Sequence, residues 1–231
     1  VSQKGGSLRI LTFNLRTSYA YGDGVNHWEK RKEACAETIL NIRPDLAGLQ
    51  EVDPTMWRTL EPALSDWHVL KGTAQTGDHE NGNGLLVRKG SFEVLDSGRF
   101  WLSDTPGLES ISFKQDWGPR ILLWARLGSF IVAVTHFDTN QECWLPSARV
   151  VLEQLGRIAG GTPVFLMGDF NTRGGGPAWS EFQKAGFRDA WIETGGGEDV
   201  FTYHEFTGRT SQARAGLTGS FSVAHGNSRL A

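Results

Sequence analysis

Asp169 and Asn171 follow an apolar segment and carry side chains that could take part in catalysis. The segment runs from Pro163 to Met167, and Gly-Asp-Phe-Asn closes it. Its composition predicts a buried strand. In an extended chain, side chains two residues apart point to the same side, so Asp169 and Asn171 are expected to lie together. A rigid strand that ends in a carboxylate and a carboxamide is suited to hold catalytic groups.

Three further polar sites also stand at the ends of apolar segments: Asn14, Glu51 and the His136/Asp138 pair. Carboxylates without thiolate neighbours suit a hard cation such as Mg²⁺ or Mn²⁺. The sequence has no Cys-x-x-Cys or His-Glu-x-x-His zinc pattern. It also lacks a P-loop and a Gly-x-Ser-x-Gly nucleophile elbow.

Each of these residues also has an ordinary structural interpretation. An Asp or Asn at the end of a strand is more often a turn residue than a catalyst. Glu51 alone fits a surface acid, and His136 alone fits a hydrogen-bonded core histidine. Arg31 and Arg120 could bind phosphate or be solvated. The order of the four polar sites along the chain favours a functional site, and no single residue carries that information.

The remaining pattern predicts the elements that position these groups. Apolar runs and turn residues predict strands at 8–14, 46–52, 67–70, 84–88, 91–97, 121–127, 130–136, 187–191 and 201–206. Helical periodicity predicts helices at 28–42, 147–158 and 178–184, and a short one after Asp53-Pro54. The segments 72–84 and 102–119 are expected to be loops that shape a substrate cleft. Strands interleaved with helices predict one α/β domain of two packed sheets covered by helices, with residues 1–7 as a loose tail.

Composition narrows the class of protein. The chain has 231 residues, of which 39% are hydrophobic, and a net charge of −3, which argues against tight, unspecific nucleic-acid binding. Its two cysteines, Cys35 and Cys143, are too few for a disulfide scaffold. No secretory or transmembrane segment stands out in the sequence. We therefore expect a cytoplasmic monomer, with a secreted protein as the alternative.

Four short motifs carry a resemblance to a known family. They are Leu-Thr-Phe-Asn-Leu ending at Leu15, Leu-Gln-Glu-Val ending at Val52, Thr-His-Phe-Asp ending at Asp138, and the Gly-Asp-Phe-Asn motif. In this order and spacing the chain resembles the endonuclease/exonuclease/phosphatase superfamily of metal-dependent phosphoesterases. The segments 100–106 and 201–204 resemble a bacterial branch. The resemblance extends from about residue 8 to residue 214.

The resemblance implies a DNase I-like fold, a two-layer β-sandwich flanked by helices. It also implies a cation site for Mg²⁺ or Mn²⁺, with Glu51 as the principal ligand and Asn14 and Asp169 beside it. Asp169 is expected to orient or deprotonate the attacking water as well.

The same resemblance implies the groups that act on the phosphate. His136 is expected to stabilise negative charge that develops on it, and Asn171 to hold it. Asn14 and Arg120 are further candidates for phosphate contacts. The substrate is then a phosphate ester, and nucleic acid, a phospholipid and an inositol head group all stay open.

The chain departs from the family after Arg214. The family continues with an Arg-Ile-Asp strand and closes with Ser-Asp-His, and neither motif occurs in this sequence. A codon choice for Arg-Ile-Asp-Trp-Ile-Leu, read one base later, encodes Gly-Leu-Thr-Gly-Ser, as in Gly216–Ser220. We therefore predict a frameshift near Arg214, a fold that lacks its last strands and an atypical tail over 216–231. The alternative to an active enzyme is an impaired remnant or binding module of the same fold.

Overall fold

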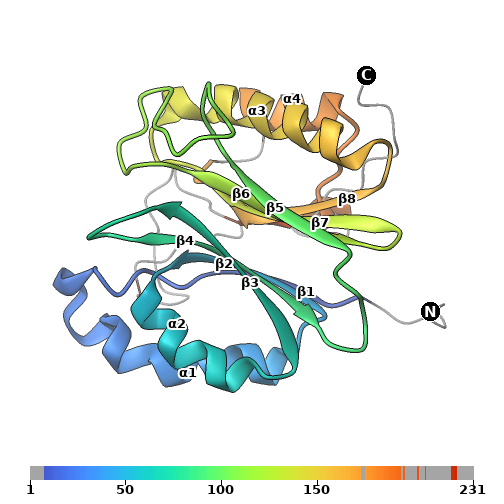
Figure 1. Ribbon diagram of the computed structural model, residues 1–231. Helices are drawn as coiled ribbons and strands as arrows, with labels where there is room; N and C mark the ends of the chain where they lie inside the picture. The colour runs from blue at the N-terminus through green and yellow to red at the C-terminus, as the bar shows by residue number, and fades with distance from the viewer. Residues whose placement is uncertain are drawn as a thin grey trace.

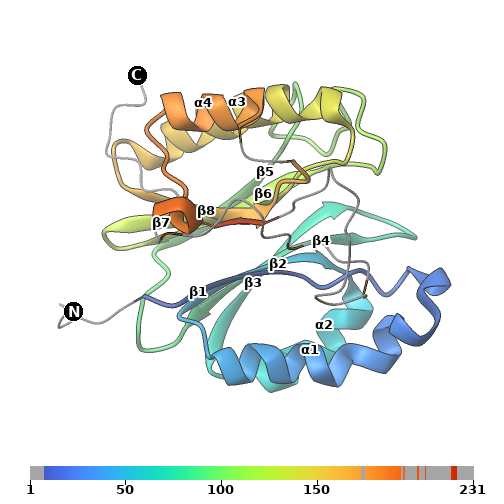
Figure 2. The same ribbon diagram turned by 180° about the vertical axis from the view of Figure 1, so that it is seen from behind.

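Two β-sheets pack face to face, and helices cover the outer face of each (Figure 1). The structure is a computed structural model, and it describes residues 8–172, 175–193, 195, 202, 206 and 220–222. The helices α1 and α2 cover the outer face of the first sheet, and α3 and α4 cover the outer face of the second, as the reverse view also shows (Figure 2). The expected two-layer sandwich flanked by helices is confirmed.

The first sheet has the strand order β1-β2-β4-β3. Its strands are β1 (Ile10–Asn14), β2 (Leu46–Val52), β3 (Trp67–Gln75) and β4 (Asn81–Arg88). β1 and β2 are parallel, so their carboxyl ends reach the same edge. The helices of this half are η1 (Tyr21–Asn26), α1 (Trp28–Ile42), α2 (Pro54–Leu60) and η2 (Glu61–Leu64).

The second sheet has the strand order β5-β6-β7-β8-β9. Its strands are β5 (Asp96–Trp101), β6 (Ile121–Leu127), β7 (Phe130–His136), β8 (Val164–Asp169) and β9 (Ser220–Ser222). β7 and β8 are parallel and are joined through α3 (Gln141–Ala159). Two further helices are α4 (Pro177–Lys184) and α5 (Ala190–Glu193).

The core between the sheets is aliphatic and contains side chains from both. Leu46 and Leu85 of the first sheet join Val132, Val134 and Met167 of the second in one buried cluster. Separate clusters fill the space between each sheet and its helices. Burial of this kind is the main stabilising term in folding, so the sandwich is a rigid base for the strand ends.

Several predicted boundaries were wrong. Much of the segment 72–84 is a hairpin rather than a loop, because β3 continues to Gln75 and β4 begins at Asn81. Gly72 and Gly82 obscured the strand pattern, although a Cβ on Gly82 would come within 1.8 Å of the Gly72 carbonyl oxygen, so pairing here requires glycine. The strand predicted at 91–97 forms later, as β5. The segment 187–191 forms no strand, and α5 begins within it.

The helix α3 begins before its predicted start. The prediction began at residue 147, whereas the helix starts at Gln141 and contains Pro146. The carboxamide of Asn140 caps it by accepting a hydrogen bond from the backbone N–H of Glu142 at 3.0 Å. Among the described residues, no helix is both long and apolar enough to cross a membrane.

Part of the atypical tail belongs to the second sheet. Ser220–Ser222 form β9, which pairs antiparallel with β8, with Phe221 opposite Gly168. The described part of the tail therefore covers the β8 edge, although we expected the fold to lack its last strands. The rest of 216–231, the predicted strand at 201–206 except residues 202 and 206, and the frameshift prediction lie outside the described residues.

Candidate active site

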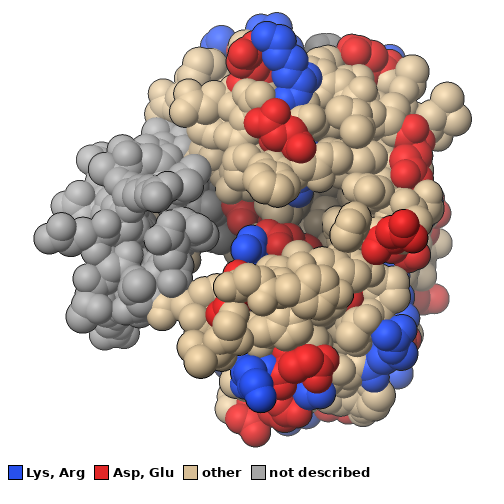
Figure 3. Space-filling model, turned by 90° about the vertical axis from the view of Figure 1, so that its left-hand side faces the viewer, with Lys and Arg blue, Asp and Glu red and all other residues tan. Residues whose placement is uncertain are grey.

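The carboxyl ends of β1, β2, β7 and β8 bring the four predicted polar sites together. His136 and Asp169 are register partners at the ends of β7 and β8. The Asn14 amide nitrogen lies 2.9 Å from Glu51 Oε1 and 3.0 Å from Asp169 Oδ2. This amide group thus links the two sheets. The face shown in Figure 3 is hollowed between the two halves of the molecule, and acidic and basic side chains are visible inside the hollow.

The orientation of the Asn14 carboxamide is fixed by the backbone. Its Oδ1 accepts a hydrogen bond from the Arg16 N–H at 2.9 Å. Because a backbone N–H needs an oxygen acceptor, the amide NH₂ group must face the two carboxylates. Asn14 therefore presents donors, and not a free oxygen, to the space between Glu51 and Asp169.

Glu51 lies at an irregular point of β2, where the pairing with β4 shifts between Leu49 and Val52. Its φ is +59°, which is unusual for a residue other than glycine. The second carboxylate oxygen accepts the Thr17 N–H at 3.1 Å. Burial by itself raises the pKa of Glu51, but two effects outweigh it and lower this pKa: the charge that His136 carries at the acidic pH where Glu51 titrates, and the Asn14 and Thr17 donors. Glu51 is thus held as a carboxylate.

Asp169 and Asn171 are tied together by a local turn. The Asn171 N–H donates to Asp169 Oδ1 at 3.0 Å, and the φ of Asn171 is +49°. Asparagine tolerates this left-handed conformation better than most residues. The Asn171 side-chain nitrogen donates to the Phe137 carbonyl at 2.9 Å and lies 3.0 Å from His136 Nε2. The strand end therefore aims the acid at Asn14 and the amide at His136.

Both ring nitrogens of His136 face nitrogen donors. Arg120 Nη1 lies 3.3 Å from Nδ1, and the Asn171 amide nitrogen lies near Nε2. Burial lowers the pKa of His136, the charge of Arg120 lowers it further, and the nearby carboxylates oppose this only in part. The ring is therefore neutral at neutral pH.

A neutral imidazole has one acceptor nitrogen and one N–H. Because a guanidinium can only donate, the Arg120 contact favours the tautomer in which His136 Nδ1 accepts and Nε2 carries the proton. Nε2–H then faces the Asn171 NH₂ group, whose other hydrogen goes to the Phe137 carbonyl, so two donor groups lie side by side there. An anionic oxygen beside the pair, at hydrogen-bond distance from each nitrogen, would accept from both.

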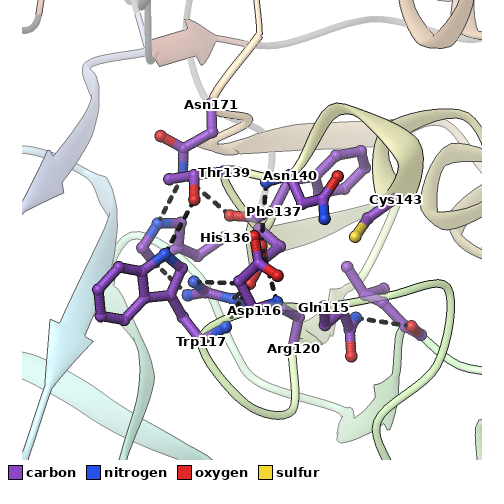
Figure 4. Close-up of polar contacts among 12 residues, drawn as sticks. Gln115, Asp116, Trp117, Arg120, His136, Phe137, Thr139, Asn140, Cys143 and Asn171 are labelled. Atoms are coloured by element: carbon purple, nitrogen blue, oxygen red, sulfur yellow. Dashed lines mark hydrogen bonds and ion pairs between the residues drawn. The ribbon is translucent and has the colours of Figure 1, made fainter.

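Asp138 is almost fully buried and contacts Arg120, which in turn contacts His136. Figure 4 shows the polar contacts around His136 and Arg120. The Arg120 Nε and Nη2 atoms each lie 3.3 Å from Asp138 Oδ2. The neighbouring loop donates its Trp117 N–H to the same oxygen at 3.1 Å, and the Trp117 indole donates to Thr139 Oγ1 at 3.0 Å. Asp138 thereby joins the predicted cleft loop 102–119 to the end of β7.

The carboxylate oxygens at the site are of the kind that binds a hard divalent cation. One oxygen of Glu51 and one of Asp169 converge on a single nitrogen of Asn14, so they can face one positive group together. Mg²⁺ binds through one or two carboxylates and takes its other ligands from water and substrate phosphate. The described residues contain no group of three or more His, Cys, Asp or Glu side chains placed to hold a metal. Among the described residues, Glu51 and Asp169 are thus the two carboxylates that could face such an ion together.

Sequence reasoning named most of these residues and missed some of their partners. All six candidates, Asn14, Glu51, Arg120, His136, Asp169 and Asn171, lie in one connected group. Thr17 contacts Glu51 through its backbone, which no side-chain pattern could reveal. Trp117 was expected only as part of a loop. Arg31 is structural, because it donates to the Asn26, Leu15 and Arg16 carbonyl oxygens.

Comparison with known proteins gives a consistent result. Residues 11–216 match the family model described as "Endonuclease/Exonuclease/phosphatase family". The protein angel of Drosophila melanogaster is 23% identical over 196 residues, which are 73% of this chain and 53% of the relative. The chain thus spans about half the length of that relative.

Two solved bacterial structures are also similar. An endonuclease/exonuclease/phosphatase from Bacteroides vulgatus is 27% identical with a TM-score of 0.72, over 80% of this chain and 74% of that one. A mannosyl-6-phosphatase from Bacteroides thetaiotaomicron has a TM-score of 0.77 over 94% and 85% of the two chains. At 22% identity, the second likeness concerns the fold alone.

Proposed function

Because the chain belongs to the endonuclease/exonuclease/phosphatase family of hydrolases, we propose that it is a phosphoesterase that depends on a divalent metal ion. Its substrate is a phosphodiester or a phosphomonoester, and Mg²⁺ or Mn²⁺ is the cofactor. Glu51 and Asp169 hold the ion. An ion bound there supplies positive charge that neutralises phosphate oxygens and promotes attack by water.

The converging donors at His136 are the observation that carries this proposal. The Asn171 NH₂ group lies 3.0 Å from His136 Nε2, and in the tautomer that Arg120 favours each of these nitrogens has a hydrogen to donate. A phosphate oxygen beside the pair, at hydrogen-bond distance from each nitrogen, would accept both hydrogens. Donors that already point to the position of developing negative charge need no reorganisation during the reaction, which is a large source of catalysis.

The chain's own residues divide the remaining work by their positions. Asp169 lies on the carboxylate side, within 3.9 Å of His136 Nε2, where it orients a water molecule and accepts its proton. Asn14 holds both carboxylates in place. Arg120 presents positive charge next to His136 and contacts the phosphate.

A second candidate is a non-catalytic remnant or binding module with the same fold. The absence of Arg-Ile-Asp and Ser-Asp-His motifs from the sequence favours it, because both supply acidic or basic groups elsewhere in the family. The same anion and cation sites would then bind a phosphate ester without hydrolysing it.

Hydrolysis of bis(p-nitrophenyl) phosphate and p-nitrophenyl phosphate distinguishes the two candidates. Each substrate is assayed with Mg²⁺, with Mn²⁺ and with EDTA, for the wild type, Asp169→Asn and His136→Asn. The enzyme proposal expects metal-dependent release of p-nitrophenol that falls at least about 100-fold in both variants. Absence of turnover in a folded wild-type sample favours the remnant instead.

A further inference from the structure

Asp138 makes more polar contacts than the end of a strand requires. Its side chain has no exposed surface, and its Oδ1 accepts the N–H groups of Asp116 and Asn140 at 3.2 and 3.0 Å. Its Oδ2 accepts the Trp117 N–H and faces two nitrogens of Arg120. Five donor contacts thus converge on one buried carboxylate.

The Arg120 guanidinium is the cation that Asp138 balances. The Arg120 side chain is 11% exposed. Burial of a charge costs several kcal/mol unless a partner compensates it, and Asp138 is the acid that the structure pairs with Arg120. A buried ion pair is often no more stabilising than apolar side chains of similar volume. The contact of this pair with His136 Nδ1, through Arg120, therefore suggests a role in the site rather than in stability.

The contacts of Arg120 lead from Asp138 to the reacting region. Nε and Nη2 face Asp138, and Nη1 faces His136 Nδ1. An arginine has five N–H bonds, so two of them have no partner among the described residues. The planar guanidinium is rigid, so a fixed contact with Asp138 fixes the direction of these remaining N–H bonds.

We propose that Asp138 is a positioning residue that orients the Arg120 guanidinium toward His136 Nδ1 and toward an oxygen of the bound phosphate. Asp138 itself touches neither the substrate nor the metal site. The phosphate contact rests on the proposed function. The effect of Asp138 on chemistry passes through Arg120, and this dependence can be measured.

A double-mutant cycle tests the proposal. Asp138→Asn keeps the shape and the acceptor for Asp116 and Asn140 but places an NH₂ group against Arg120. We expect this change to lower kcat/KM for bis(p-nitrophenyl) phosphate about 10- to 100-fold, since small misplacements of a binding group have effects of this size. In an Arg120→Gln background the same change should have almost no further effect. If the two substitutions lower kcat/KM by independent factors that multiply in the double variant, the proposal is wrong.

A second readout does not depend on turnover. Binding of inorganic phosphate in the presence of Mg²⁺ is measured by calorimetry across the same cycle, where the two effects should again fail to multiply. If phosphate binding shows this coupling but neither the wild type nor any variant hydrolyses the substrate, the proposed enzyme function fails while the positioning role stands. Failure of the wild type to bind phosphate would overturn the positioning role.

Two further variants keep the result interpretable. Asp189 is also buried and accepts backbone N–H groups, from Trp191 and Ile192. Asp189→Asn is therefore a matched control, expected to reduce stability without changing kcat/KM. If Asp138→Asn does not fold, Arg120→Lys replaces it, because lysine keeps the charge but cannot reproduce the guanidinium contacts. A wild-type kcat/KM in Arg120→Lys would overturn the proposal.

Discussion

Glu51 and Asn171 hold backbone conformations that their elements do not require. Both have a positive φ, +59° and +49°, and both carry side chains of the candidate site. Left-handed backbone at a residue other than glycine costs about 1–3 kcal/mol and persists where the surroundings fix it. For Glu51 the surroundings are the irregular β2–β4 pairing and the Thr17 N–H. At these two residues, a less stable backbone conformation directs a side chain into the candidate site.

The cysteines illustrate how burial controls reactivity at the scale of a residue. Cys143 has no exposed surface, and its thiol donates to the Phe113 carbonyl. Burial, with help from nearby acids, raises the pKa of Cys143 to about 11. Burial also raises the pKa of Cys35, although Arg31 opposes the shift.

We therefore predict that the native protein reacts with Ellman's reagent very slowly at pH 8. Only the thiolate is reactive, and at this pH on the order of one Cys143 thiol in a thousand is ionised. In guanidinium chloride both thiols should react fully within minutes. Rapid modification of the native protein would show that one of these thiols is accessible or ionised.

At the scale of elements, the sequence predicted the strands whose ends form the site because their pattern is local. The runs ending at Asn14, Val52, His136 and Asp169 were each found, since apolar runs with polar ends carry a strong signal. The hairpin over 72–84 was missed because its strands depend on pairing between glycine-containing segments. The Asp138–Arg120 contact was missed because it joins two elements that only the fold brings together.

Asp53 links an element boundary to the site. It is fully buried, and its Oδ1 caps α2 by accepting the Thr55 and Met56 N–H groups. Its Oδ2 accepts from Thr17 and Ser18, next to the segment that contacts Glu51.

Asp53→Ala should lower the free energy of unfolding by about 2 kcal/mol or more, because it removes a helix cap and leaves buried donors unpaired. Urea unfolding measures this loss. Asn140→Ala, which removes the cap of α3 alone, serves as the comparison and should cost about 1 kcal/mol. Equal losses in the two variants would mean that the contacts of Asp53 to Thr17 and Ser18 add nothing.

At the scale of the whole molecule, the two halves of the site depend on how closely the sheets pack. Asn14 and Glu51 come from one sheet, and His136 and Asp169 come from the other. Gly48 lies where the two sheets approach each other closely. A Cβ on Gly48 would come within 2.7 Å of Val134 Cγ2 and 3.0 Å of Met167.

We predict that Gly48→Ala destabilises the protein by about 1–3 kcal/mol, because an added methyl group in a packed core forces the sheets apart. Chemical denaturation gives the free energy, and kcat/KM should fall as well because Asn14 is moved away from Asp169. Gly107→Ala is the control, since a Cβ there meets no atom within 4 Å. A Gly48→Ala protein as stable as this control would mean that the sheets are not in contact at Gly48.

The central claim is that a divalent cation at Glu51 drives hydrolysis of a phosphoester, and the Mn²⁺ dependence of the initial rate tests it most directly. The rate of bis(p-nitrophenyl) phosphate hydrolysis is measured over increasing Mn²⁺ for the wild type, Glu51→Gln and the exposed-acid control Glu61→Gln. The wild type and the control should saturate alike, and Glu51→Gln should lose at least about 10-fold in apparent Mn²⁺ affinity or lose activity. A wild-type rate that EDTA does not change, or a Glu51→Gln curve equal to the wild-type curve, would contradict the claim.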